Sequence, residues 1–314
     1  MQFTFGSDPE FMLHNEGKYR SAIDVVPGDK ENRHKVGPHE FYYDNVMAEC
    51  AIKPGKSKRG TIQNMHNCFK KYAALVSPHK LVVQAAQKYP ICELAHPKAQ
   101  EIGCDTEYCV YALTDVKPPE EEFATNSLRT AGGHIHLGAE FLQNDEYACY
   151  FAIRMLDLFL GIPSVFIDKD KTTRSRKALY GNAGRFRLPA HGIEYRALSN
   201  FWLSSPKLVE LVYDICAFTL RFVQKEKHLD FWDVDKDRLD SDDAWAEEDF
   251  SPADCYTCHG YDVAQLRFAI DNSNKQKAKK FMKIVSKTLP RSLHRRIEQA
   301  MTYPMFDFYK EWKL

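Results

Sequence analysis

The chain has 314 residues, of which 44% are hydrophobic and 27% charged, the composition of an ordinary globular protein. Its 43 Lys and Arg residues balance 43 Asp and Glu residues, which argues against a protein that coats nucleic acid along its whole length. Polar and helix-breaking residues interrupt the longest apolar run, 156–167, so no run approaches the roughly 18 residues of a membrane span.

Two features bear on where the protein works. The N-terminus has no basic segment ahead of an apolar one and reaches Asp8 at once, so we expect no signal peptide. The nine Cys residues are an odd number spread thinly over the chain, which favours a reducing compartment with mostly buried, free thiols. We therefore expect a cytoplasmic protein.

The first part of the chain carries strand signals and then one helix signal. Residues 3–13 and 41–52 mix aromatic and aliphatic side chains with polar neighbours and predict strands on either side of a loop at 27–38. Residues 61–76 carry apolar side chains at helical spacing, and Thr61 at their start is a residue that can cap a helix. This pattern predicts a strand-rich beginning followed by an amphipathic helix.

The remaining elements mix strands and helices without the regular alternation of a parallel α/β fold. We therefore predict an α+β fold with a mostly antiparallel sheet flanked by helices. In chain order, the expected elements are short strand pieces within 81–130, a strand at 132–138, a helix at 145–160 closed by Gly161, a basic loop at 169–177, a strand at 193–198 and a helix from 205 to about 225.

Charge separates along the last third of the chain. Residues 229–250 hold ten Asp and Glu against two basic residues, and residues 275–296 hold nine Lys and Arg and no acid. The simpler interpretation is two solvated surfaces. The alternative is that the basic segment binds an anionic substrate or nucleic acid.

Ionisable residues two positions apart in strand-like stretches give the strongest functional signal. Side chains at i and i+2 share a face of a strand, and a single such pair is usually solvent-facing. Several on one face would be unstable through desolvation unless a bound ion neutralised them, and carboxylates with imidazole suit Mg²⁺ or Mn²⁺. The pairs are Asp8 and Glu10, His134 and His136, and Glu194 and Arg196, joined by Asp44 and Glu49 from the second strand.

Basic residues precede the last of these pairs by one to two strand lengths. Planar guanidinium groups bind phosphate and carboxylate through two parallel hydrogen bonds. Carboxylates for a metal, arginines for phosphate and an open sheet face together indicate nucleoside triphosphate chemistry. The basic residues are Arg174, Arg176, Lys177, Arg185 and Arg187.

Four motifs, taken in their order and spacing, resemble the phage-type carboxylate–amine ligases (amidoligases), distant relatives of glutamine synthetase and glutamate–cysteine ligase. The resemblance covers most of residues 3–205 and no part of 226–314. It implies a glutamine-synthetase-like catalytic domain at 1–225, with 226–314 as a charged, largely helical extension packed on the same domain. The motifs are GSDPEF from Gly6 with the later Asp44 and Glu49, AGGHIHLG from Ala131, LYGNAGRFR from Leu179, and GIEYRALSNFW from Gly192.

The resemblance implies a role for each matched residue. The implied metal ligands are Asp8, Glu10, Glu49, His134 and Glu194, with Asp44 a weaker match. The implied nucleotide contacts are His136 and Arg187, to which the pattern of basic residues adds Arg174 and Arg176. The implied catalytic residues are Arg196 at the transferred phosphate, together with Arg185 and Glu49.

Two departures from the family pattern concern the first strand. The first acid is Asp8 where better-known relatives carry Glu, which shortens its reach. Pro9 between the two acids removes a ladder donor, so we expect an edge strand or a bulge there.

The implied reaction has two steps. ATP phosphorylates a carboxylate in the presence of Mg²⁺ (or Mn²⁺), and an amine then displaces phosphate from the acyl phosphate. The implied substrates are a small-molecule or peptide carboxylate and an amine of unknown identity. We expect no membrane partner, and the basic segment 275–296 keeps nucleic acid open as one. The phage resemblance implies the cytoplasm of an infected bacterium.

Two other functions remain open at this stage. A metal-dependent hydrolase would use His134, His136 and an acid to activate water. A non-catalytic nucleotide-binding phage protein would keep the fold without turnover. The Cys255-x-x-Cys258-His259 pattern lacks a second Cys pair and an export signal, so chance or a small structural site explains it better than a cofactor.

Overall fold

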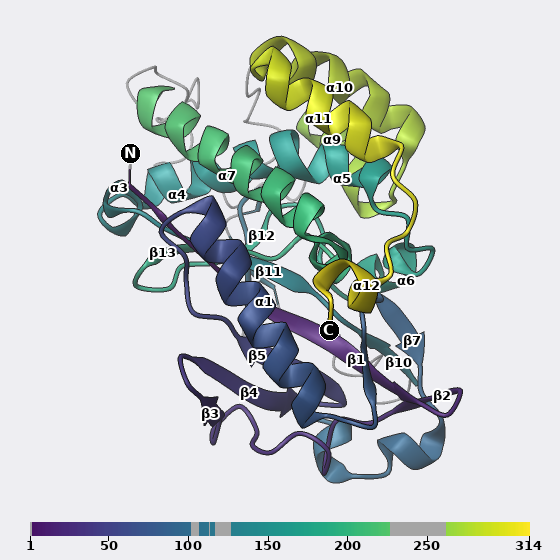
Figure 1. Cartoon of the computed structure of the whole chain (residues 1–314). Coiled ribbons are helices and arrows are strands. Elements are labelled where there is room, and N and C mark those ends of the chain that lie inside the picture. Colours follow the sequence, from purple (N-terminus) through teal and green to yellow (C-terminus); the bar gives the residue numbers. More distant parts are fainter. Residues whose placement is uncertain (1, 102–106, 113, 117–126, 227–261) are drawn as a thin grey trace.

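The computed structural model describes residues 2–101, 107–112, 114–116, 127–226 and 262–314. Within this part of the chain, eleven strands form one sheet and every ladder between named strands is antiparallel (Figure 1). The main path runs β3-β4-β5-β1-β11-β13-β12-β8-β9; β2 and β6 also pair with β1, and β7 and β10 form a separate ladder. The strands are β1 (Thr4–Asn15), β2 (Lys18–Arg20), β3 (His34–Val36), β4 (His39–Asp44), β5 (Met47–Ala51), β6 (Lys80–Val82), β7 (Ala86–Lys88), β8 (Glu107–Cys109), β9 (Thr114–Val116), β10 (Leu128–Thr130), β11 (Gly133–Gly138), β12 (Arg185–Arg187) and β13 (Gly192–Tyr195).

The helices differ widely in length, and several short ones border the sheet. A π-helical turn, η3 (Asp157–Gly161), joins two of them. Three short 3-10 helices, η1 (Ile91–Leu94), η2 (Pro97–Ala99) and η4 (Asn200–Ser204), lie in the connections. The α-helices are α1 (Lys58–Leu75), α3 (Glu140–Gln143), α4 (Glu146–Leu156), α5 (Ile162–Ile167), α6 (Thr173–Lys177), α7 (Pro206–Glu226), α9 (Val263–Asp271), α10 (Lys275–Thr288), α11 (Arg291–Met301) and α12 (Phe308–Trp312).

One face of the sheet is covered by helices, as Figure 1 shows for α1 and α7. Phe11 of β1 packs its ring on Phe69 of α1 and Phe308 of α12, and Phe5 packs on Tyr213 of α7. Helices α9 to α11 form an outer layer against α5, α7 and η3. The prediction of an α+β fold with an antiparallel sheet flanked by helices is confirmed. On the opposite face, polar side chains lie beside a second, smaller hydrophobic cluster that includes Met12 and Val46.

Helix α1 begins three residues before its predicted start. Its N-cap is Ser57, whose Oγ accepts a hydrogen bond of 3.1 Å from the Gly60 N–H. Thr61, the predicted cap, is buried inside the helix. The cap prediction was wrong because Ser57 has the same capping chemistry one turn earlier, where the chain bends before the helix.

The predicted helix at 145–160 continues well past its expected end. Asp145 caps it, and the chain then passes through η3 and Gly161 into α5. By length and composition, Glu146–Ile167 is the one stretch among the described residues that could cross a membrane. In the fold 89% of its most apolar window is buried, so it serves as a core helix, and burial carries the helix through Gly161.

The described part of the expected C-terminal extension, residues 262–314, is helical and packs on the rest of the protein. Trp312 is buried and donates a hydrogen bond of 2.7 Å to the Leu203 carbonyl. The acidic segment 229–250 and the Cys255-x-x-Cys258-His259 pattern lie outside the described residues.

Candidate active site

The open face of the sheet brings most of the predicted residues together. The strand order β5-β1-β11-β13-β12 places the strands that carry them next to one another. Period-two alternation points the named side chains to this face and their neighbours to the core. The directly opposed cross-strand pairs are Glu10 with Glu49, Asp8 with His134, His136 with Glu194, and Arg187 with Glu194.

Three of these side chains converge closely enough to hold one metal ion. One ligand atom each from Asp8, His136 and Glu194 lies within 4.8 Å of the others. The His136 Nε2 is 3.1 Å from the Asp8 Oδ1. Two carboxylates and one imidazole form a donor set that Mg²⁺ or Mn²⁺ accepts. The geometry thus groups His136, which the resemblance assigns to the nucleotide, with the two acids.

The electrostatics keep both acids of this cluster ionised. Burial works against a charged Asp8, but His136 and His134 outweigh it and hold the pKa of its carboxyl well below the usual range. Burial and Asp8 likewise work against a charged Glu194, and Arg196 brings its pKa below the usual value. Ionised carboxylates are the form that binds a cation.

Two further residues lie next to the cluster: His134 on β11 and Arg196 directly after β13. The His134 Nδ1 lies 3.4 Å from the Asp8 Oδ1, and the Arg196 Nη1 is 3.3 Å from the same nitrogen. Arg196 is buried and pairs with both Glu194 and Glu107, at 2.8 Å from its Nε to the Glu107 Oε2. Its guanidinium is therefore held in place by two carboxylates.

Glu107 is a site residue that the sequence analysis missed. It is buried on β8 and also lies 3.5 Å from the Arg185 Nε, so it links two arginines of the open face. The only sequence signal was the alternation of Glu107, Tyr108 and Cys109 in a stretch too short to be identified as a strand with a buried acid.

A second group of carboxylates lies on β1, β4 and β5. The Glu10 Oε2 accepts a hydrogen bond of 2.6 Å from the Gly132 N–H, and the Glu49 Oε1 accepts one of 2.7 Å from Tyr42. The buried Glu49 Oε2 has no hydrogen-bond partner among the described residues. Burial, Asp44 and Glu10 raise the pKa of Glu49 well above its usual value. A cation beside Glu10 and Glu49 would relieve this repulsion, so the residues fit a second metal ion.

The predicted arginines divide into two groups. Arg185 and Arg187 extend from β12 on the open face, and the Arg187 Nη1 lies 3.8 Å from the Glu194 Oε1. Arg176 is buried and faces the same side, whereas Arg174 is exposed and lines a separate cavity with Lys171. Arg174 is not brought to this face because residues two apart on the short helix α6 point in different directions.

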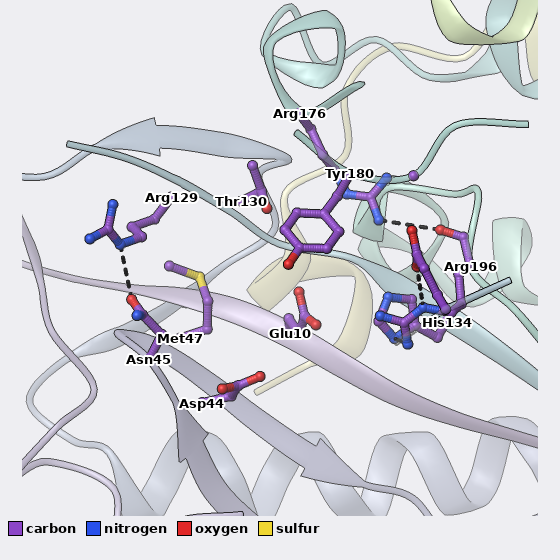
Figure 2. A pocket seen from close by; sticks show the side chains of 12 residues that line it. Glu10, Asp44, Asn45, Met47, Arg129, Thr130, His134, Arg176, Tyr180 and Arg196 are labelled. Atoms are coloured by element: carbon purple, nitrogen blue, oxygen red, sulfur yellow. Dashed lines mark hydrogen bonds and ion pairs between the residues drawn. The ribbon is translucent and has the colours of Figure 1, made fainter. Parts of the chain in front are cut away.

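A pocket opens beside these residues and reaches from Glu10 on β1 to Glu107 on β8. Figure 2 shows Glu10 and Asp44 in its middle, Asn45 and Arg129 at one end, and Arg196 at the other. Asp44 pairs with Lys30 at 2.6 Å. The lining residues are Glu10, Asp44, Asn45, Met47, Glu107, Arg129, Thr130, His134, Arg176, Tyr180, Gly181 and Arg196.

The chain is similar to a known protein family over about half of its length. Residues 126–280 match the family described as "Phage phiEco32-like COOH.NH2 ligase-type 2". The matched segment contains His136, Glu194 and Arg196, whereas Asp8 and Glu10 precede it. It continues to residue 280, so the similarity extends into the part of the chain, 226–314, in which the motifs showed none. A search of curated proteins finds no match.

Proposed function

We propose that this chain, whose residues 126–280 match the phage-type carboxylate–amine ligase family, is an ATP-dependent enzyme that forms an amide or peptide bond. The observation that supports ATP use is the convergence of Asp8, His136 and Glu194 within 4.8 Å, beside the arginines of β12. Such a set can hold a divalent cation and a triphosphate together.

The chemistry explains why ATP would be needed. A carboxylate is a poor electrophile because it is negatively charged and has no adequate leaving group. In the first step its oxygen attacks the γ-phosphorus of ATP, and ADP leaves. In the second step the amine nitrogen attacks the acyl carbon, phosphate leaves with the bonding electron pair, and the amine gives up a proton.

The residues of the open face would position these groups. Asp8, His136 and Glu194 would hold one divalent cation, and Glu10 with Glu49 would hold a second. When bound, such cations neutralise the charge of the phosphate oxygens and polarise the transferred phosphoryl group.

The arginines have complementary tasks in this proposal. Arg185 and Arg187 would donate hydrogen bonds to phosphate oxygens above β12. Glu107 and Glu194 would hold the Arg196 side chain in one conformation, which keeps its positive charge beside the transferred group. Because phosphoryl transfer depends mainly on position and charge, no covalent enzyme nucleophile is required.

Capture with hydroxylamine tests this proposal because hydroxylamine takes the place of the natural amine, whichever amine that is. The protein is incubated with ATP, Mg²⁺, hydroxylamine and a panel of amino acids and mono- and dicarboxylic acids. We expect at least one acid to give a hydroxamate together with an equal amount of ADP. The variants Asp8→Asn and Glu194→Gln should lose this product, and the exposed Glu298→Gln variant on α11 is the matched control.

Three outcomes would contradict the proposal. Hydrolytic turnover that depends on zinc, with no nucleotide binding, would support a metal-dependent hydrolase instead. Nucleotide binding with no ADP release for any acid would support a non-catalytic protein. Full activity in the Glu194→Gln variant would remove the metal cluster from the reaction.

A further inference from the structure

Arg176 is a buried charge whose donors the protein does not use. Its side chain is 2% exposed. The Nη2 donates a hydrogen bond of 3.4 Å to the Arg196 carbonyl, while the Nε and Nη1 have no hydrogen-bond partner among the described residues. Burying an unsatisfied guanidinium costs several kcal/mol, so such a group calls for an anionic partner from outside the chain.

Two glycines leave the space that this guanidinium occupies. A Cβ at Gly181 would lie 1.6 Å from the Arg176 Nη1, and a Cβ at Gly132 would lie 2.9 Å from its Nη2. Gly181 also has a φ of +77°, which other residues rarely adopt. The backbone at these two glycines therefore packs closely against the Arg176 guanidinium and fixes its position.

Arg176 lines the pocket beside Glu10. Figure 2 shows Arg176 and Tyr180 above Glu10, on the pocket wall. Arg196 also lines this pocket, but Glu107 and Glu194 already pair with its guanidinium. No carboxylate of the described residues pairs with Arg176, so an anion that enters the pocket meets a guanidinium charge that the protein leaves unpaired.

The arginines expected to bind phosphate are not among the described residues that line this pocket. Arg185 and Arg187 extend from β12, whereas the pocket wall includes Arg176 together with Glu10 and Asp44 of β1 and β4. If the triphosphate lies along β12, the group that reaches Arg176 comes from the second substrate.

We propose that this pocket binds the acid substrate and that Arg176 binds the carboxylate that becomes phosphorylated, an assignment that rests on the proposed function. Beyond Glu10 the pocket carries Asp44 and, at its far end, the polar residues Asn45 and Arg129. The acid therefore carries further polar or charged groups away from its reacting carboxylate, as an amino acid or a peptide end does.

Two fluorinated anions test the assignment by ¹⁹F line broadening, without any need for turnover. Trifluoroacetate reports on carboxylate binding and monofluorophosphate on phosphoryl binding, each with and without Mg²⁺. We expect Arg176→Gln to weaken trifluoroacetate binding at least tenfold and monofluorophosphate binding less than threefold. Arg176→Lys keeps the charge but not the planar guanidinium, so its affinity for trifluoroacetate should lie between those of Arg176→Gln and the unaltered protein. Arg174→Gln should bind trifluoroacetate as tightly as the unaltered protein does.

The opposite pattern would overturn the assignment. Loss of monofluorophosphate binding with trifluoroacetate binding intact in Arg176→Gln would make Arg176 a nucleotide residue. Equal trifluoroacetate binding in both proteins, or none in the unaltered protein, would remove the carboxylate site. If near-ultraviolet circular dichroism shows that Arg176→Gln does not fold, the trifluoroacetate affinity of Arg176→Lys decides the assignment. A failed hydroxamate assay with this binding pattern intact would refute the ligase reaction but not the anion site.

Discussion

Buried ionisable groups are handled differently at two places on the sheet, at Asp157 on the helix-covered face and at Glu49 and Arg176 on the open face. On the face toward the helices, both carboxylate oxygens of Asp157 are satisfied: the hydroxyl of Tyr195 donates to one at 2.7 Å and that of Tyr111 to the other at 2.8 Å. On the open face, the Glu49 Oε2 and two nitrogens of Arg176 have no hydrogen-bond partner among the described residues. One strand, β13, serves both arrangements through successive residues.

This difference separates polar groups that serve the fold from those that serve a ligand. A buried group whose partners all come from the chain contributes to folding and needs nothing else. A buried group left without partners is costly until a ligand supplies them. Substitutions on the helix-covered face should therefore lower stability, and substitutions on the open face should lower activity or binding.

The largest effect is expected on the open face, for Glu194→Gln. The amide keeps the shape of the side chain but removes a charge from the metal cluster, so hydroxamate formation should fall at least about 10³-fold, which corresponds to about 4 kcal/mol. The midpoint of thermal unfolding should stay within a few degrees. Activity within tenfold of that of the unaltered protein would contradict the claim that the carboxylates of the open face serve a ligand.

A loss of stability is expected on the other face, for Asp157→Ala. Two buried tyrosine hydroxyls then lose their acceptor, and at 1–3 kcal/mol each the free energy of unfolding should fall by about 3 kcal/mol in urea titrations. Tyr111→Phe, which removes one donor, should cost less. A stable Asp157→Ala protein with abolished activity would show that Asp157 acts in the chemistry.

The same carboxyl predicts a pH dependence of stability. Burial raises the pKa of Asp157 to about 7 in the folded protein, from 3.8. The folded state therefore binds a proton more tightly, and its stabilising effect is lost as the pH rises from about 4 through about 7. Relative to Asp157→Asn, which does not titrate, the unaltered protein should lose stability over this range in urea titrations. Parallel stability curves would contradict the raised pKa.

A divalent cation should stabilise the folded protein through the open face and not through the helix-covered face. Mg²⁺ or Mn²⁺ at one hundred times its Kd should raise the free energy of unfolding by about 2.7 kcal/mol, because the cation binds the folded state. EDTA should reverse the gain. Asp8→Asn should reduce it, and Asp157→Asn should retain it because Asp157 lies on the other face. An equal gain in both variants would place the cation elsewhere.

The smallest effect is expected for Arg174→Gln. Arg174 is exposed and lines a cavity apart from the pocket, so hydroxamate formation should change less than threefold. Arg187→Gln, on the open face, should lower it more than tenfold. A large loss in Arg174→Gln would extend the site to the far side of α6.

Local patterns in the sequence predicted much of the architecture but not how far each element extends. The strand pattern at 3–13 and the helix expected from 205 to about 225 agree well with β1 and α7. The end expected at Gly161 was wrong because burial of the following apolar residues outweighs the helix cost of one glycine. Glu107 was missed because its strand is three residues long, too short for a period to be recognised.

What the sequence determined by itself is the side of its own strand to which each ionisable residue points, because successive side chains alternate between faces. That rule places Asp8 with Glu10, His134 with His136, and Glu194 with Arg196. Which residues of different strands meet was decided only by the tertiary structure, since register and strand order depend on hydrogen bonds between segments far apart in the chain. Register and strand order bring His136 to Asp8 and Glu194, and α6 packing turns Arg176 inward while Arg174 stays in solvent.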